Sequence, residues 1–458
     1  MPVQSATATI STPPENKLGT MKISRLILSM SIPIMISMLV QAMYNIVDSI
    51  YVARYDVDAL TALSMAFPVQ NLMIAVGVGA SIGTNACLSQ ALGAKKFVRV
   101  NRVAMQAILL ALLGSLVFIC VGLAGIGPFM RSQTTIGPII RHGSDYLFVV
   151  TVFSQGLFMQ IMMEKLLQST GKSIYFMITQ LTGAVINIIL DPIMIFGYLG
   201  CPAMGVTGAA AATVIGQYCA SLLGLWFNLR VNTEIEFRLA NLRPDWRILG
   251  KILSIGIPSM LMTSILSFTT VFLNRILISF TKYAVAVFGA YFKLQSFVFM
   301  PIFGLNNGII PIVAYNYGAR RKDRIKEAIF KAALYATIIM LAGLAVFHLF
   351  PRELLGLFNA NDEMIAIGVP ALRILSLCFI FAGFCIISMS VFTALGKAMY
   401  SLITTLVRQV FFLIPAAWLL SLLGNLDLIW FSFTIAEVAS VLAILYFHVR
   451  VHRMLEKI

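Results

Sequence analysis

The chain has 458 residues, of which 59% are hydrophobic and only 11% are charged. A soluble protein needs about a quarter of its residues charged, so this composition excludes a water-soluble globular protein. The net charge of +15 would suit a nucleic-acid-binding protein only if the basic residues gathered on one exposed face. Their positions along the chain therefore decide what the charge means.

Apolar residues fall into long stretches separated by short polar segments. Stretches of about 17 to 25 apolar residues cross a bilayer as helices, because a helix satisfies its backbone hydrogen bonds internally. The sequence therefore predicts an all-α integral membrane protein with twelve transmembrane helices. The predicted spans are 26–52, 59–84, 103–126, 144–163, 173–199, 206–229, 248–280, 283–313, 328–350, 364–390, 398–423 and 427–447.

The basic residues lie mainly in alternate loops. When every second loop is assigned to the cytoplasm, 24 Lys and Arg residues lie on that side of the membrane and 5 on the other. The positive-inside rule then predicts that both termini are cytoplasmic. The basic excess is a topology signal, and we expect no nucleic-acid partner.

A repeat with one constant offset runs through the chain. Gly93-Ala94-Lys95-Lys96 recurs as Gly318-Ala319-Arg320-Arg321, an offset of 318 − 93 = 225. Each copy holds six spans, an even number, so both copies enter the membrane in the same orientation. The repeat predicts two parallel six-helix bundles related by a pseudo-two-fold axis along the membrane normal. We expect a disordered cytoplasmic tail over 1–24, an N-terminal bundle over 25–230, a cytoplasmic linker over 231–247, a C-terminal bundle over 248–448 and a cytoplasmic tail over 449–458.

Two acidic residues lie deep in the spans of the first copy. A carboxylate inside the hydrocarbon region costs free energy, so Asp48 and Asp191 are candidate functional groups. Asp48 shares a helix face with Asn45 and Gln41, and Asp191 repeats this pattern with Asn187, four residues before it. The alternative is that the amide side chains only join neighbouring helices, as they often do in membranes.

Three further side chains, Thr213, Gln217 and Tyr146, are predicted to complete a polar pocket with these residues. Oxygen ligands suit hard cations, and two buried carboxylates also suit a shared proton. A proline in each of two helices, Pro33 before Asp48 and Pro192 beside Asp191, provides a point at which the helix bends.

The second copy lacks these acids. At the offset of 225, Asp48 corresponds to Leu273 and Asp191 to Ala416, so we expect the cation site only in the first bundle. We expect Glu437 to pair with Lys293 or Arg408. The remaining positive charge suggests a place for a carboxylate or phosphate of a substrate. The polar residues expected within the second bundle are Lys293, Gln295, Arg373, Arg408 and Glu437.

Several motifs together resemble the multidrug and toxic compound extrusion (MATE) transporters, and within them the DinF-like prokaryotic branch. The matching residues are Pro33 with Gln41, Asn45 and Asp48; Gly93-Ala94-Lys95-Lys96; Gln168 to Lys172; Asn187 to Pro192; and Gly208 to Thr213. The resemblance implies an exporter that alternates between inward-open and outward-open forms while protons or sodium ions run inward. It places cation coupling, and a sodium ion if sodium is used, on Asp48, Asn187, Asp191 and Thr213.

These observations favour a secondary antiporter of drug-like or metabolite molecules over other classes. An ATP-driven pump is not supported, because Leu166 stands where a phosphate loop ending at Lys172 requires glycine. We expect no enzymatic activity, no cofactor other than the coupling ion, and a monomer in the lipid bilayer of a prokaryotic plasma membrane. A flippase of lipid-linked precursors is the alternative function.

Overall fold

The structure is a computed structural model and describes residues 15–238, 242–358 and 360–456. Residues 1–14 of the predicted tail, 239–241 of the predicted linker and 457–458 of the C-terminal tail lie outside the described residues. The regular structure of the described residues is helical. Its elements are α1 (Lys17–Thr20), α2 (Ile23–Tyr55), α3 (Val57–Gly93), α4 (Phe97–Ala124), α5 (Ile126–Gln133), α6 (Gly137–Val152), α7 (Gln155–Ser169), α8 (Ser173–Phe196), η1 (Tyr198–Gly200), α9 (Val206–Arg230), α10 (Trp246–Ile278), α11 (Lys282–Gly318), α12 (Lys322–Leu349), α13 (Pro351–Gly356), α14 (Asp362–Ser376), α15 (Phe379–Ala394), α16 (Ala398–Leu406), the π-helical η3 (Val407–Leu413), α17 (Ile414–Ser421) and α18 (Leu426–Glu456).

Within the described residues, ten helices or continuous helical runs are long and apolar enough to cross a membrane. Two further pairs pass the same test only when taken together, and each is bent: α6 with α7 by 48° and α14 with α15 by 46°. Counting each pair as one span gives twelve, which confirms the predicted fold class. The bent pairs occupy equivalent places in the two copies, as the repeat requires.

The outer surface of the helices is apolar. On α4, for example, Leu116, Val117 and Leu123 are all exposed. Large exposed apolar patches are rare on soluble proteins and mark contact with another apolar phase. In a chain with twelve spans, that phase is the hydrocarbon of the bilayer.

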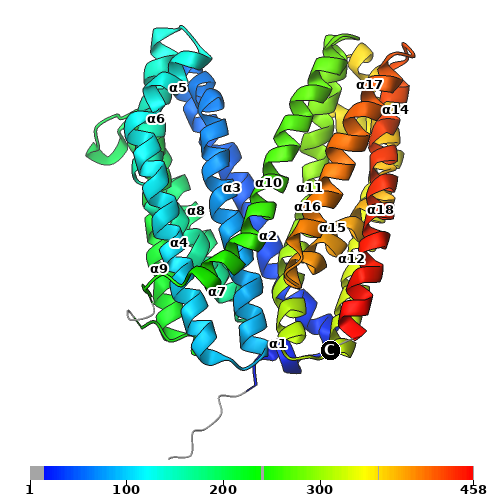
Figure 1. The fold of residues 1–458 in the computed structure, drawn as a ribbon. Coiled ribbons are helices and arrows are strands. Elements are labelled where there is room, and N and C mark those ends of the chain that lie inside the picture. The colour runs from blue at the N-terminus through cyan, green and yellow to red at the C-terminus, as the bar shows by residue number, and fades with distance from the viewer. Residues whose placement is uncertain (1–14, 239–241, 359, 457–458) are drawn as a thin grey trace, which may run out of the picture.

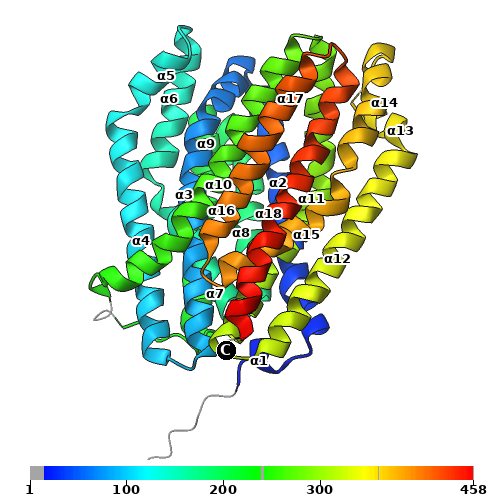
Figure 2. The ribbon, with the colours of Figure 1, turned by 45° about the vertical axis from the view of Figure 1, so that its right-hand side comes forward.

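The helices form two groups that meet at one end and diverge toward the other (Figures 1 and 2). Helices α2 to α9 form one group, and α10 to α18 form the other. They meet through α2 packed on α11 and α3 packed on α10 and α11. This junction lies at the end that carries α1, which we call the α1 end; the ordered C-terminus lies there too.

Glycines allow the two groups to approach closely at this junction. A Cβ on Gly83 of α3 would lie 2.1 Å from the carbonyl oxygen of Ile252 on α10. A Cβ on the repeat-related Gly308 of α11 would lie 2.4 Å from Oγ of Ser31 on α2. Neither distance leaves room for a side chain, so the repeated glycines permit the contact between the bundles.

The chain from Glu15 onward is packed against both bundles, although the tail was predicted to be disordered as far as residue 24. Leu18 of α1 is fully buried. The carbonyl oxygen of Leu18 accepts hydrogen bonds from Asn316 Nδ2 at 3.1 Å and from Arg324 at 3.3 Å, both in the second bundle. This packing could not be predicted from the sequence, because a four-residue helix has no periodicity to detect.

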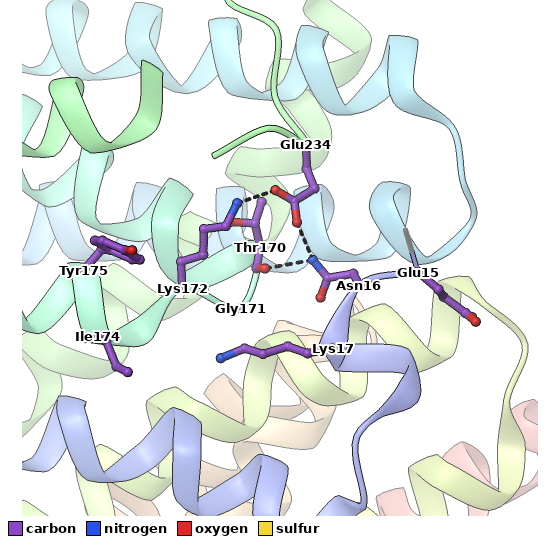
Figure 3. A pocket seen from close by; sticks show the side chains of 9 residues that line it. All are labelled: Glu15, Asn16, Lys17, Thr170, Gly171, Lys172, Ile174, Tyr175 and Glu234. Atoms are coloured by element: carbon purple, nitrogen blue, oxygen red, sulfur yellow. Dashed lines mark hydrogen bonds and ion pairs between the residues drawn. The ribbon is translucent and has the colours of Figure 1, made fainter. Parts of the chain in front are cut away.

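On its other side, α1 is bound to the first bundle. Asn16 Nδ2 donates to the carbonyl oxygen of Thr170 at 2.9 Å and to Glu234 Oε1 at 2.7 Å (Figure 3). Glu234 also forms an ion pair with Lys172. These residues line a pocket of about 310 Å³, into which Lys17 also extends. The α1 segment therefore bridges the two bundles at the end where they meet.

Candidate functional site

A polar cavity of about 240 Å³ lies inside the first bundle. Its walls come from α2, α3, α7, α8 and α9, and one residue, Asn307, comes from α11 of the second bundle. Three residues predicted for the cation site line it: Gln41, Asn187 and Thr213. Helices α2, α8 and α9, which were predicted to lie in one bundle, place these three side chains in one cavity.

Asn187 connects two helices at the wall of this cavity. Its Nδ2 donates to Asp191 Oδ1, one turn further along α8, at 3.2 Å, and to Thr213 Oγ1 on α9 at 3.2 Å. Asp191 is fully buried. Its second oxygen, Oδ2, and the amide oxygen of Asn187 have no hydrogen-bond partner among the described residues. Two buried oxygen atoms without donors are suited to bind a cation or a proton.

Asp48 lies on α2, close enough to Asp191 for the two carboxylates to interact electrostatically. Its Oδ1 is also buried without a hydrogen-bond partner in the described part of the chain. Tyr146 is buried on α6, and its hydroxyl accepts a hydrogen bond from Gln70 Nε2 at 2.8 Å. Neither Asp48 nor Tyr146 lines the cavity. Asp191 does not line it either, so the two acids predicted for the cation site lie outside the cavity wall.

The structure separates two residues that the sequence placed together on α2. Gln41 lines the cavity and accepts a hydrogen bond from Gln180 Nε2 at 3.1 Å, whereas Asn45 is exposed outside it. Tyr44 lines the cavity instead. Both positions are compatible with helical spacing from Gln41 and Asp48, so only the rotation of α2 against its neighbours chooses between them. Pro33 and Pro192 lie within the continuous helices α2 and α8.

Sequence reasoning missed two charged residues of the cavity. Glu164 and Lys165 line it from α7 and are both buried. The fourth predicted span ended at residue 163, and Lys165 was counted with the cytoplasmic loops. Helix α7 instead continues to Ser169. The available signal was the pair of adjacent charges directly after an apolar run. Because polar residues follow, the pair was interpreted as the start of a loop.

The second bundle contains a different arrangement of charges. Of the two partners predicted for Glu437, the structure selects Arg408, whose Nη1 lies 3.3 Å from Oε2 of Glu437. Arg408 lies in the π-helical segment η3. Lys293 and Arg373 are exposed, and Lys293 Nζ lies 5.9 Å from the ring centroid of Phe358. Gln295 is half-buried on α11. These residues do not form one cluster with the Arg408–Glu437 pair.

The family model MatE matches residues 33–193 and again residues 258–419. The chain belongs to the MatE family. The two matched segments start 258 − 33 = 225 residues apart, which is the offset of the internal repeat. The chain is thus a multi-pass membrane transporter, and transporters of this family are not enzymes.

Relatives and solved structures agree with this membership over nearly the whole chain. The chain is 28% identical over 412 residues to multidrug export protein MepA of Staphylococcus haemolyticus (strain JCSC1435), covering 89% of each chain. It is similar to an outward-facing conformation of a multidrug resistance MATE family transporter of the MOP superfamily, with a TM-score of 0.90 and 26% identity, covering 98% of this chain and 100% of that one. A MOP superfamily transporter from Pyrococcus furiosus Vc1 (DSM3638), for which a reverse polarity of the binding pocket suggests a different function, gives a TM-score of 0.89 at 26% identity and the same coverage.

Proposed function

We propose that this MatE family member is a secondary antiporter that exports small organic molecules, drug-like compounds among them, in exchange for protons or sodium ions that enter the cell. The names of the relatives, as multidrug export and multidrug resistance proteins, support the substrate class. The observation that carries the antiport is the group of unpartnered buried oxygen atoms on Asp48, Asn187 and Asp191 beside the cavity.

A cation bound by these oxygen atoms would supply the driving force. One charge that crosses a potential of 100 mV releases about 2.3 kcal/mol. The transporter captures this free energy only if cation binding changes the balance between two conformations. Asp48 on α2 and Asp191 on α8 lie on different packed helices, so neutralising their repulsion would alter how these helices pack.

Alternating access in this proposal starts from the present form, in which the bundles meet at the α1 end and diverge at the other (Figure 1). We assign the α1 end to the cytoplasm, because alternate loops divide the basic residues 24 to 5. The present form would then be open to the outside, and its similarity to an outward-facing MATE structure supports this. We further propose that the chain works as a monomer in the plasma membrane of a prokaryote.

The test is export in proteoliposomes with an imposed proton or sodium gradient, using ethidium as the fluorescent probe. Asp48→Asn and Asp191→Asn should each abolish gradient-driven export while the protein still folds, since an amide keeps the size of the carboxylate but carries no charge to neutralise. Leu273→Asp, the repeat-related change made in the Asp48→Asn background, is the matched control and should not restore coupling. Gradient-driven export at the wild-type rate in both Asn variants would refute the proposed site.

A further inference from the structure

The cytoplasmic half of α7 contains a pair of charged residues that the proposed cation site does not use. Residues 162–170 are buried at every position, so this half of the helix is enclosed on all sides. Glu164 is only 5% exposed and Lys165 only 7%. Buried charges inside a membrane protein cost free energy unless they are compensated, so these two residues need an explanation.

Lys165 is compensated across the junction between the bundles. Its Nζ donates to Asn307 Oδ1 on α11 at 2.9 Å and to Gln168 Oε1 on its own helix at 2.9 Å. Gln168 Nε2 in turn donates to the carbonyl oxygen of Asn307 at 2.7 Å. The ammonium group thus bonds neutral amides, and one of them belongs to the other bundle.

Glu164 is compensated far less. Its Oε1 accepts one hydrogen bond, from Gln160 Nε2 at 3.0 Å. The adjacent Lys165 acts on this carboxylate electrostatically, without a direct ion pair among the described residues. Glu164 and Asn307 both line the cavity. A buried carboxylate with a single hydrogen bond at a cavity wall attracts a cation, and the ammonium group of the adjacent Lys165 bonds Asn307 instead.

The repeat shows that the common fold does not need this arrangement. At the offset of 225, Glu164 corresponds to Met389, Lys165 to Ser390 and Asn307 to Ile82. The second copy therefore builds the equivalent helix and contact without charges. The charged pair serves the cavity of the first bundle, where the proposed cation site also lies.

We propose that Lys165 is a positioning residue that exchanges between two partners as the α1 end closes and opens. With the α1 end closed, Lys165 bonds Asn307, and a cation in the cavity occupies Glu164. When the bundles separate, Asn307 leaves with α11, and the ammonium group of Lys165 turns to the carboxylate of Glu164. A cation on Glu164 removes this second partner and so favours closure. The inference rests on the proposed alternating access and adds the residue that links cavity occupancy to the junction.

The cation can come from two sources that share this chemistry: an organic ammonium or phosphonium compound, or the coupling proton or sodium ion. Either source places a monovalent positive charge beside Glu164. The loss of one hydrogen bond to a buried charged group corresponds to a roughly tenfold change in an equilibrium between two states.

The experiment measures the distance between spin labels on cysteines at Lys96 and Asp323, which are exposed on opposite bundles at the α1 end. The background is the full chain in lipid nanodiscs with Cys120, Cys201 and Cys219 changed to Ser. Asn307→Ala should shift the population about tenfold toward the longer distance. Lys165→Met removes the bonds of both states, so in this background the distance should respond neither to Asn307→Ala nor to added cation. Glu164→Gln should shift it toward the shorter distance and no longer respond to added cation. Ser390→Ala is the matched control and should change nothing.

The cation titration distinguishes the two sources of the cation. Closure of the wild type by tetraphenylphosphonium at constant pH and sodium assigns Glu164 to an organic cation, whereas closure by acidification or sodium alone assigns it to the coupling ion. A wild-type distance that responds to neither, or an Asn307→Ala variant with the wild-type distance distribution, overturns the inference. Failure of the proposed function is read separately, as the absence of gradient-driven ethidium export by the wild type in proteoliposomes.

Discussion

Gly93 of α3 and Gly318 of α11 each lie against a carbonyl group three residues before the other. A Cβ on Gly93 would lie 1.9 Å from the carbonyl oxygen of Tyr315, and a Cβ on Gly318 would lie 2.0 Å from that of Gln90. The two contacts are related by the repeat, since 318 − 93 and 315 − 90 both equal 225. The pseudo-two-fold axis therefore passes through the place where the bundles touch.

The first prediction concerns Gly93→Ala and Gly318→Ala, each of which adds a methyl group at this contact. Both carbonyl groups belong to the backbone, so they cannot move aside as the end of a flexible side chain could. The added methyl group must therefore push the bundles apart, which destabilises the closed junction by about 1–3 kcal/mol. We expect faster hydrogen–deuterium exchange at the α1 end. Gly250→Ala is the control, because a Cβ there meets nothing within 4 Å. Unchanged exchange in both variants would mean that the junction tolerates the methyl group.

The second prediction concerns Lys17 in the pocket beside α1. Burial, and then repulsion from Lys172, lower the pKa of Lys17 below its usual value of 10.5. The docked state therefore disfavours the charged lysine. Between the lowered pKa and 10.5, the undocked segment binds more protons than the docked one, so docking of α1 should strengthen as the pH rises through this range. Lys17→Met should give stronger docking already at pH 7.

Protease protection of residues 15–20 checks this. The protection of the Lys17→Met variant should exceed that of the wild type at pH 7, and the difference should shrink above pH 10. Asn16→Ala, which removes the bonds to Thr170 and Glu234, should lower protection at both pH values. A larger difference between Lys17→Met and wild type at high pH than at pH 7 would contradict the argument.

The third prediction concerns the ion pair of the second bundle. Arg408→Ala leaves the 6%-exposed side chain of Glu437 as a buried unpaired charge, so we expect a loss of about 3 kcal/mol of stability with cation coupling retained. Thermal unfolding in detergent measures the stability. Glu437→Gln in the Arg408→Ala background should recover much of the loss. Lys293→Ala, at an exposed position, is the control and should unfold like the wild type.

The fourth prediction concerns orientation. A single cysteine at Gln133, exposed at the end of α5, should react with an impermeant thiol reagent added outside cells, and one at Asp323, exposed at the start of α12, should not. Asn359, a further position that the sequence suggests for outside labelling, lies outside the described residues. Labelling of the Asp323 position alone would invert the topology that we propose.

The sequence by itself determined the membrane spans and the repeat, and it identified three of the residues that line the cavity, Gln41, Asn187 and Thr213. Hydropathy and charge are properties of each segment, and a span must satisfy its own backbone hydrogen bonds, so these features are local. The offset of 225 was enough to predict that Asp48 and Asp191 have no counterparts in the second copy. The spacing of Asn187 and Asp191 likewise placed both on one face of α8, where they share a hydrogen bond.

Only the tertiary structure decided which of several equally spaced side chains meet. The rotation of α2 placed Tyr44 in the cavity and left Asn45 outside it. The packing of α7 against α11 buried Lys165, which the sequence counted as a loop residue, and gave it Asn307 as a partner. Helical spacing restricts a side chain to a face but does not fix which neighbour covers that face. Contacts between residues far apart in the chain depend on how whole helices pack, and no local pattern records them.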